Sequence, residues 1–429
     1  MSTRSTRRNL LKSTALASIA IPTLIPASVL GKNGRVAPSN RIVLGGIGVG
    51  RRGQKVLDGF FQEKDAQFVA VADPQKERRE IIKRKTDEHY GNKDCAIYDD
   101  MSGILERDDI DAVLVTTGDR WHATASIYAA RAGKDIYCEK PCAMNIQECQ
   151  ELDDNIKKHK RVFQAGTQRR SVPNFKLAAD LALKGKLGQM KEVHAGILKL
   201  QNYLDPLPAQ LEPDPAIINW DKWLGPAPKI PFNEAYCRGR WRNHNGLYSA
   251  WRLPEWGSHT IDLCQWAADA DGTTPIEFEA ESDSLLHAKY ANGIKLVMRL
   301  SSGKGVGDWI KGLGTCPVRF VGDEGWVEAG DHLGIKSSHP KLLKGKINKQ
   351  IRGTDPALHI RNFLDCVKSR KQTVCNSTAV RYGHMACFAA AISWKLGRKV
   401  VFDPKKESFV NDTEANGLRT YKRRTPYTI

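Results

Sequence analysis

Hydrophobic and polar positions follow two periods along the first part of the chain. Short, nearly continuous apolar runs predict buried strands at 41–45, 66–73, 109–117, 134–141 and 161–168. Longer runs with helical spacing lie between them, at 52–61, 121–133 and 145–159. Alternating strands and helices indicate a parallel sheet with right-handed crossovers.

The pattern changes after residue 168. A helix at 174–185 precedes a strand at 188–200, and two pairs of alternating runs follow at 285–301 and 316–330. Asn292-Gly293 joins the first pair, which is a strong signal for a β-hairpin. We therefore expect an α/β chain whose second domain is α+β with a mostly antiparallel sheet. The predicted divisions are 1–38 (N-terminal segment and linker), 39–168 (Rossmann-type parallel domain) and 169–429 (α+β domain).

The N-terminus resembles a twin-arginine export signal. Arg7 and Arg8 precede an apolar run that continues to about Leu30, with small residues near its end. An uncleaved anchor is an alternative, but Pro22 and Pro26 interrupt the run, so we expect no membrane span after processing. The twin-arginine route carries folded proteins, typically with a cofactor inserted first. The expected location is the bacterial periplasm.

Composition narrows the class of protein further. The 429 residues are 41% apolar and 27% charged, as in soluble globular proteins of two domains. Six of the 18 net positive charges lie in the first 38 residues, and no nucleic-acid motif accompanies the others. We therefore expect no nucleic-acid partner. The ten cysteines lack metal-ligand spacing, so we expect no metal and interpret them as buried small apolar residues.

A glycine motif follows the first predicted strand. Gly48, Gly50 and Gly53 give G-x-G-x-x-G at the start of a helix, which is typical of a dinucleotide site. Asp73 ends the next strand, where an acid accepts hydrogen bonds from ribose hydroxyls and repels a 2′-phosphate. NAD is therefore favoured over NADP, although Arg78 and Arg79 nearby leave some use of NADP open.

Two further stretches resemble the Gfo/Idh/MocA family (glucose–fructose oxidoreductase/inositol dehydrogenase). The family loop T-P-D-x-x-H followed by a helix and E-K-P corresponds here to "TGDRWH" and "EKP", with Gly118 in place of the proline. The resemblance extends over nearly the whole chain after the signal. The matching residues are Thr117, Asp119, His122, Glu139, Lys140 and Pro141.

The family resemblance implies roles for several of these residues. Lys140 would lie at the nicotinamide and contact the reacting substrate oxygen, where an ammonium stabilises a developing alkoxide. His122 and Gln168 would face the nicotinamide half of the cofactor. The complete predicted cofactor site is Gly48, Gly50, Arg51, Gly53, Asp73, Thr117, Asp119, His122, Glu139, Lys140 and Gln168.

The predicted substrate side lies further along the chain. Six of the ten tryptophans fall between residues 220 and 267, so this stretch is either a sugar-binding wall or a loop held by its own aromatic side chains. Trp241 and Arg242 are the candidates there. Glu255 and His259 match the family pattern D-x-x-x-H with Glu for Asp, and lie one helical turn apart. His259 can accept a hydroxyl proton, Glu255 can orient a hydroxyl or the imidazole, and Asp262 is assigned to structural support.

These observations predict an NAD-dependent oxidoreductase that transfers hydride between nicotinamide and a secondary alcohol of a sugar, polyol or glycoside. The predicted catalytic residues are Lys140, His259 and Glu255; Lys140, Trp241, Arg242, Glu255 and His259 would bind substrate. Two alternatives remain open. One is a redox-neutral enzyme with tightly bound NAD, which would perform glycoside cleavage through a 3-keto intermediate, epimerisation or coupled sugar oxidation and reduction. The other is a non-catalytic sugar- or NAD-binding protein. We expect a homodimer or homotetramer.

Overall fold

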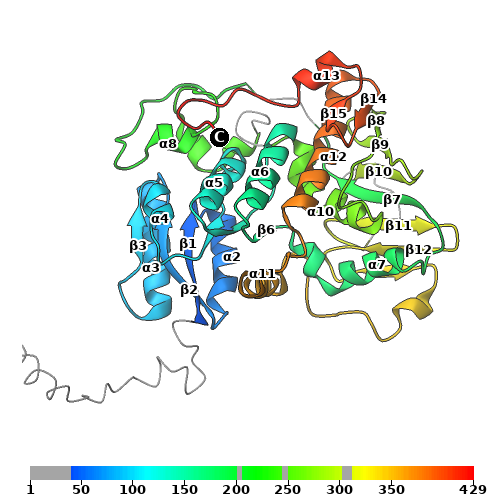
Figure 1. The fold of residues 1–429 in the computed structure, drawn as a ribbon, viewed down its shortest axis with the longest axis horizontal. Coiled ribbons are helices and arrows are strands. Elements are labelled where there is room, and N and C mark those ends of the chain that lie inside the picture. The colour runs from blue at the N-terminus through cyan, green and yellow to red at the C-terminus, as the bar shows by residue number, and fades with distance from the viewer. Residues whose placement is uncertain (1–39, 201–204, 244–249, 302–311) are drawn as a thin grey trace, which may run out of the picture. The chain divides into compact units, whose positions relative to one another are not determined.

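The computed structural model describes residues 40–200, 205–243, 250–301 and 312–429 (Figure 1). The predicted export signal at 1–38 lies outside the described residues. Residues Ile42–Ile429 form one compact unit built around two β-sheets. Among the described residues, no helix combines the length and the apolar character that crossing a membrane requires.

The first sheet has six parallel strands in the order β3-β2-β1-β4-β5-β6. They are β1 (Ile42–Ile47), β2 (Ala66–Ala72), β3 (Ala96–Tyr98), β4 (Ala112–Val115), β5 (Asp135–Cys138) and β6 (Phe163–Ala165). Every residue of β4 and β5 is buried, as expected for central strands covered by helices on both faces. The predicted Rossmann-type parallel sheet is confirmed.

Helices connect these strands, and one later helix completes their core. The connecting helices are α2 (Arg51–Phe61), α3 (Lys76–Tyr90), α4 (Ser102–Leu105), α5 (Asp119–Arg131) and α6 (Ile146–Lys158). Helix α11 (Ala357–Ser369) comes from the C-terminal part of the chain but lies beside α2 (Figure 1). Its Phe363 packs edge-on against Phe60 and Tyr137, so this helix shares the core of the first sheet.

The second sheet has nine strands in the order β13-β12-β11-β7-β10-β9-β8-β14-β15, and only the β7–β10 pair is parallel. They are β7 (Met190–Ile197), β8 (Glu277–Ala280), β9 (Leu285–Lys289), β10 (Lys295–Leu300), β11 (Val318–Gly322), β12 (Trp326–Ala329), β13 (Ile335–Ser337), β14 (Val400–Asp403) and β15 (Ser408–Phe409). Both predicted hairpins are present as β9–β10 and β11–β12. Gly293 in the first has φ +90°, which glycine adopts without a side-chain clash. The mostly antiparallel second sheet is confirmed.

Helices α7 (Pro173–Leu183), α10 (Arg252–Ala267) and α12 (Ser377–Leu396) share one apolar core with this sheet. In Figure 1, α12 runs between α6 and the strands β8 and β14. Short 3₁₀ turns lie at Gln168–Ser171 and Pro340–Leu343. The predicted helix at 256–267 is present but begins four residues earlier, at Arg252.

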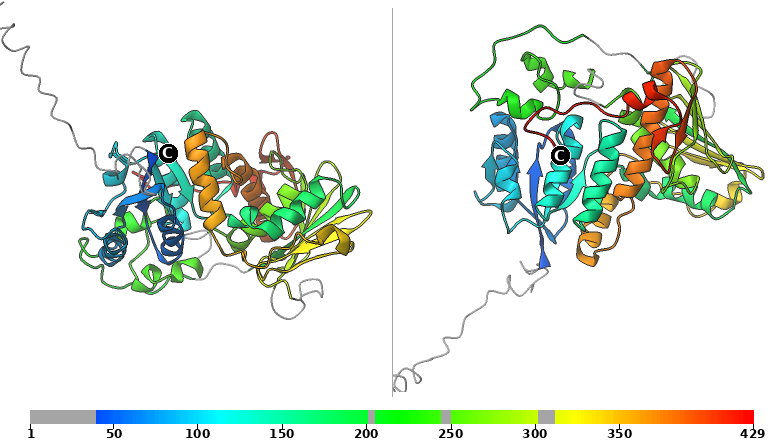
Figure 2. Two further views of the ribbon diagram at one scale, coloured as in Figure 1. Left: turned by 90° about the horizontal axis from the view of Figure 1, so that it is seen from below. Right: turned by 45° about the horizontal axis from the view of Figure 1, so that its top comes forward.

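Residues 205–243, which we call the strap, contain α8 (Trp220–Leu224), α9 (Glu234–Cys237) and a 3₁₀ turn at Arg240–Asn243. The tail, residues 418–429, follows α13 (Thr413–Gly417) and runs alongside α8 (Figure 2). All ten cysteines are unpaired and buried, which confirms their interpretation as core residues.

Candidate active site

The glycine motif forms a tight loop between β1 and α2. Gly48 has φ +67°, and a Cβ atom there would lie 2.4 Å from Thr117 Cγ2. A Cβ atom at Gly53 would lie 2.2 Å from Thr116 Oγ1, so the helix can approach the sheet only with glycine here. These two close approaches are the ones a dinucleotide-binding turn needs. Main-chain N–H groups at the start of α2 are then available for phosphate oxygens.

Asp73 lies directly after β2, at the carboxyl end of the sheet. Its carboxylate is buried, and Oδ1 accepts a hydrogen bond from Gln75 N at 2.9 Å. Burial raises the pKa of Asp73 to about 6, although Arg78 and Arg79 oppose this shift. Arg79 donates to the main-chain oxygens of Asp73 at 3.1 Å and Ala216 at 3.3 Å, so its guanidinium is committed to structure.

Helix α5 brings two more predicted residues to the same edge. The carboxylate of Asp119 accepts a hydrogen bond from Ala250 N at 3.0 Å. His122 is buried, and its Nδ1 lies 2.7 Å from the main-chain oxygen of Pro141. Burial lowers the pKa of His122, which keeps the ring neutral near pH 7. A neutral ring with Nδ1–H donated to that carbonyl leaves Nε2 as an acceptor.

The E-K-P segment follows β5 and joins the two halves of the site. Arg52 Nε donates to Glu139 Oε1 at 2.9 Å, which ties the glycine loop to this segment. Lys140 Nζ donates to the main-chain oxygen of Glu255 at 2.8 Å. The ammonium therefore lies at the first turn of α10, which carries Glu255, one turn before His259.

Glu255 and His259 share one side of α10, but no hydrogen bond joins their side chains among the described contacts. Burial raises the pKa of Glu255, and Lys140 opposes the shift. Burial, together with the nearby cations Arg169 and Lys140, lowers the pKa of His259 well below its ordinary value. His259 is therefore neutral near pH 7 and can accept a proton.

Several buried polar atoms on these residues have no hydrogen-bond partner among the described residues. They are His122 Nε2, Gln168 Oε1, Glu255 Oε2, Trp256 Nε1 and His259 Nδ1. Leaving a buried polar atom unpaired costs about 1–3 kcal/mol, so such a cluster is typical of a surface that receives a polar ligand. Donors and acceptors are both represented, which suits hydroxyl and amide groups.

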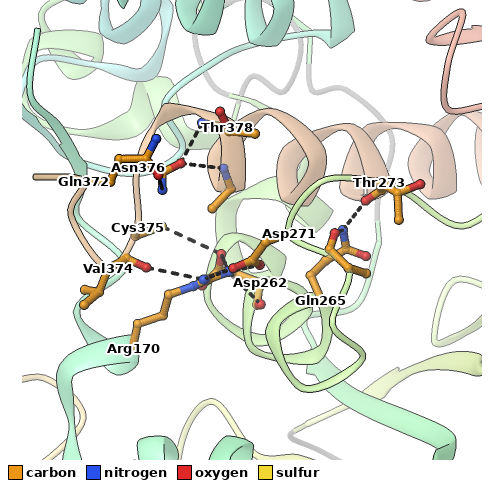
Figure 3. Close-up of polar contacts among 12 residues, drawn as sticks. Arg170, Asp262, Gln265, Asp271, Thr273, Gln372, Val374, Cys375, Asn376 and Thr378 are labelled. Atoms are coloured by element: carbon orange, nitrogen blue, oxygen red, sulfur yellow. Dashed lines mark hydrogen bonds and ion pairs between the residues drawn. The ribbon is translucent and has the colours of Figure 1, made fainter. Parts of the chain in front are cut away.

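Two arginines in the 3₁₀ turn after β6 form buried ion pairs beside the site. Arg169 binds Asp331 through two hydrogen bonds of 2.9 and 2.7 Å. Arg170 binds Asp262 and Asp271 (Figure 3). Asp262, which follows His259 on α10, is thereby used in structural support, as predicted.

One part of the tryptophan-rich stretch is a loop held by its own aromatic side chains, and parts of it also line the candidate site. Trp220 and Trp223 stack at 4.6 Å and pack with Phe232 and Tyr236, so this part is held by its own aromatic side chains. Trp241 is buried beneath Arg242, whose Cζ lies 4.3 Å from the ring centroid.

One cleft of about 1130 Å³ collects these groups. All the predicted site residues line it except Gly53, which packs inward against Thr116. Sequence reasoning missed further lining residues, because nothing in the local pattern brings the strap or the loops of the second sheet to this edge. They include Ile218, Trp223 and Cys237 of the strap and Thr315 in the loop before β11. The cleft is also lined by Arg52, Arg120, Arg169 and Trp256, which neighbour predicted residues, and by Arg78, which the sequence placed near Asp73.

The residues present fit a nicotinamide dinucleotide. The glycine cradle would hold the diphosphate, and Asp73 would bind the adenosine ribose. His122 and Gln168 would face the nicotinamide half, because His122 Nε2 and Gln168 Oε1 are buried acceptors with no hydrogen-bond partner among the described residues. Fold and cleft together are those of a dinucleotide-binding protein with a Rossmann-type first sheet.

The chain belongs to the Gfo/Idh/MocA oxidoreductase family. Residues 42–167 match the description "Oxidoreductase family, NAD-binding Rossmann fold". Residues 201–429 match "Oxidoreductase family, C-terminal alpha/beta domain". The expected family is thus confirmed, with its oxidoreductase class and NAD-binding domain.

Curated relatives resemble only part of the chain. A 2,7-anhydro-N-acetylneuraminate hydratase of Mediterraneibacter gnavus is 28% identical over 35% of this chain and 37% of its own length. A glycosyl hydrolase family 109 protein of Shewanella sp. is 33% identical over 31% of this chain and 30% of its own length. A myo-inositol 2-dehydrogenase of Thermotoga maritima is 28% identical over 34% and 42%, respectively. The matches therefore span less than half of each relative.

Solved structures share the fold at low identity. The WlbA dehydrogenase of Bordetella pertussis, in complex with NADH and UDP-GlcNAcA, has a TM-score of 0.63 at 15% identity. The alignment covers 85% of this chain and 98% of that one. An aldose-aldose oxidoreductase of Caulobacter crescentus has a TM-score of 0.61 at 16% identity, over 84% and 100% of the two chains.

Proposed function

We propose that this protein transfers hydride between NAD and a secondary alcohol of a sugar, polyol or glycoside. The observation that carries the proposal is that Lys140 and His259 line one cleft with the glycine cradle, and that Lys140 Nζ donates to the main-chain oxygen of Glu255, one helical turn before His259. Buried polar atoms of Glu255 and Trp256 that accept or donate no hydrogen bond among the described residues line the same cleft and suit a polyhydroxylated ligand.

The residues divide the chemistry between them. A nicotinamide held by the cleft would supply the acceptor for the hydride of the carbinol carbon. Neutral His259 accepts the hydroxyl proton, and the carbon–oxygen bond becomes a carbonyl. The Lys140 ammonium stabilises the negative charge that develops on the oxygen during this step. Glu255 binds a neighbouring hydroxyl and fixes which carbon faces the cofactor.

The preferred cofactor is NAD rather than NADP. The buried Asp73 carboxylate suits two ribose hydroxyls and disfavours a 2′-phosphate. Arg79 is engaged with the main-chain oxygens of Asp73 and Ala216, so it is not free to bind that phosphate.

Oxidation of a panel of hexoses, N-acetylhexosamines, inositols and glycosides with NAD tests this function, with formation of reduced nicotinamide as the readout. We expect the Lys140→Ala variant to lose turnover while it still binds NADH. Wild-type protein that binds NADH and sugar but never changes the redox state of the cofactor would support the non-catalytic binding protein instead.

A second candidate is a redox-neutral reaction with the hydride returned to an intermediate. Relatives named as a hydratase and a glycosyl hydrolase favour it, because neither name describes net oxidation. Denaturing the purified protein without added nucleotide and quantifying NAD(H) distinguishes the two. About one cofactor per chain supports redox-neutral chemistry, whereas an empty site that fills on adding NAD supports an ordinary dehydrogenase.

We propose in addition that the protein is exported to the periplasm by the twin-arginine route and assembles as a homo-oligomer. Arg7, Arg8 and the apolar run after them support export. Replacing both arginines with lysine should leave the protein in the cytoplasmic fraction. Light scattering on the purified protein tests the dimer or tetramer, and a monomer would contradict it.

A further inference from the structure

The strap joins the loop that carries the ribose-binding acid through main-chain contacts. Gln75 and Ile218 form an antiparallel bridge. Lys76 N donates to Ile217 O at 2.9 Å, and Asn219 N donates to Pro74 O at 3.1 Å. The strap therefore continues the edge of the cleft directly beyond Asp73.

A second set of contacts fixes α8 against the start of α5. Arg120 Nε donates to Trp223 O at 2.8 Å, and its guanidinium lies 3.6 Å from the centroid of the Trp223 ring. Trp121 Nε1 donates to Lys222 O at 3.0 Å. Gly225 approaches so closely that a Cβ atom there would lie 2.1 Å from the Trp121 ring. The strap thus spans from the ribose end of the cleft to the loop near the nicotinamide end.

Arg78 links the strap to the phosphate loop. Its Nη2 donates to Cys237 O in the strap at 2.8 Å. Its Nη1 lies 3.0 Å from the position that a Cβ atom on Gly50 would occupy, so the guanidinium reaches over the glycine loop. A guanidinium there is placed to bind a diphosphate oxygen and the strap together.

The tail holds the strap from its outer side. Arg424 pairs with the Asp221 carboxylate and donates to the main-chain oxygens of Gly225 at 3.1 Å and Asp221 at 2.9 Å. Tyr427 OH donates to Asp221 Oδ2 at 3.0 Å. Arg423 pairs with Glu151 at 2.6 Å and so ties the tail to α6 (Figure 2, right).

We infer that the strap, latched by Arg78 inside and by the tail outside, closes over the ribose–diphosphate part of the cofactor and makes its release slow. The inference rests on the proposed function, because it takes the cleft to hold NAD(H). Strap residues Ile218, Trp223 and Cys237 line the cleft together with Gly50 and Asp73. A dinucleotide on the glycine loop would therefore leave only when the strap separates from residues 74–79. Slow release of the cofactor favours the redox-neutral reaction, because a cofactor that stays bound must give its hydride back on the same protein.

Dissociation of NADH provides the test. The protein is loaded with NADH and chased with excess NAD, and the loss of NADH fluorescence gives the dissociation rate. Asp221→Ala and Arg424→Ala remove the outer latch, and neither residue lines the cleft. We expect each to speed release about tenfold, the factor equivalent to about 1.4 kcal/mol.

A matched control removes an ion pair of the same kind elsewhere. Arg398 pairs with Asp412 at 2.5 Å on the surface and does not line the cleft, so Arg398→Ala should release NADH at the wild-type rate. Equal rates in wild type and both latch variants would overturn the inference and leave the proposed function intact. Wild-type protein that binds no NADH would overturn both. Circular dichroism of each variant separates faster release from unfolding.

Discussion

Arg170 donates two parallel hydrogen bonds to the Asp262 carboxylate, of 2.7 Å from Nε and 2.8 Å from Nη2 (Figure 3). Both side chains are almost completely buried. The pair joins the 3₁₀ turn after β6 to α10, one turn after His259, and so helps to position the helix that carries His259 against the first sheet. Asp271, four residues after the end of α10, accepts two further hydrogen bonds from Arg170, one from Nη1 and one from Nη2.

Breaking this pair should destabilise the whole protein. Arg170→Met leaves the Asp262 carboxylate buried without its partner, and we expect a loss of about 3–5 kcal/mol in the free energy of unfolding. Urea denaturation measures it. Asp271→Asn is the control, because Asp271 is 42% exposed and should cost less than about 1 kcal/mol. Equal effects of the two substitutions would contradict a buried structural pair.

Turnover should withstand mild acid. The lowered pKa of His259 keeps its ring neutral as pH falls through 6.5, so the acid limb of kcat should lie well below that value. His259→Asn should reduce kcat by about 10²–10⁴-fold and leave NADH binding unchanged. A wild-type acid limb centred at or above 6.5, or an active Asn variant, would refute His259 as the proton acceptor.

The preference for NAD should depend on pH. Because burial raises the pKa of Asp73 to about 6, protonation below that pH removes the charge that repels a 2′-phosphate. The dissociation constant for NADP divided by that for NAD should therefore fall toward one as pH falls through 6. In Asp73→Asn this ratio should be close to one both above and below pH 6. The 2′-phosphate of NADP also titrates near this pH, and the variant measures that contribution alone. A ratio that changes equally with pH in wild type and variant would contradict the role of Asp73.

Cofactor binding should be sensitive to a single methyl group on the glycine loop. Gly53→Ala places a Cβ atom 2.2 Å from Thr116 Oγ1, so α2 must move away from the sheet and NADH binding should be lost. Gly272→Ala is the matched control, because no atom lies within 4 Å of its added Cβ. Isothermal titration with NADH compares the two variants, and tight binding by Gly53→Ala would contradict the cradle.

Those parts of the fold that depend on local pattern were predictable from sequence. The buried strands around β4 and β5, the glycine loop and the Asn292-Gly293 hairpin each carry their signal within about ten residues. The structure brings Lys140, His122 and Asp73 to one cleft. Asp73 and Lys140 each follow a strand at the carboxyl edge of the parallel sheet, whereas His122 was expected there from the family resemblance.

Long-range relationships were not predictable in the same way. The strap is held through main-chain oxygens such as those of Ile217, Trp223 and Cys237, and a main-chain bond leaves no mark on residue type. Phe363 reads as one apolar position of an amphipathic helix, and only the fold shows that it packs on Phe60 beside the first sheet. The pairing of Arg170 with Asp262 likewise joins residues 92 positions apart.

Transfer of deuterium tests the central claim most directly. Purified protein with NAD would be incubated with sugars and polyols deuterated at their carbinol carbons, quenched with cold alkali during turnover, and its nicotinamide examined by mass spectrometry. The account predicts deuterium in the nicotinamide ring for at least one sugar, and none in Lys140→Ala. If the hydride is kept, the label stays in the reduced nicotinamide; if it is returned, the label is in the nicotinamide only during turnover, so the reaction must be quenched before it is complete. Unlabelled nicotinamide in wild-type protein that demonstrably binds both NAD and the sugars would contradict hydride transfer at this site.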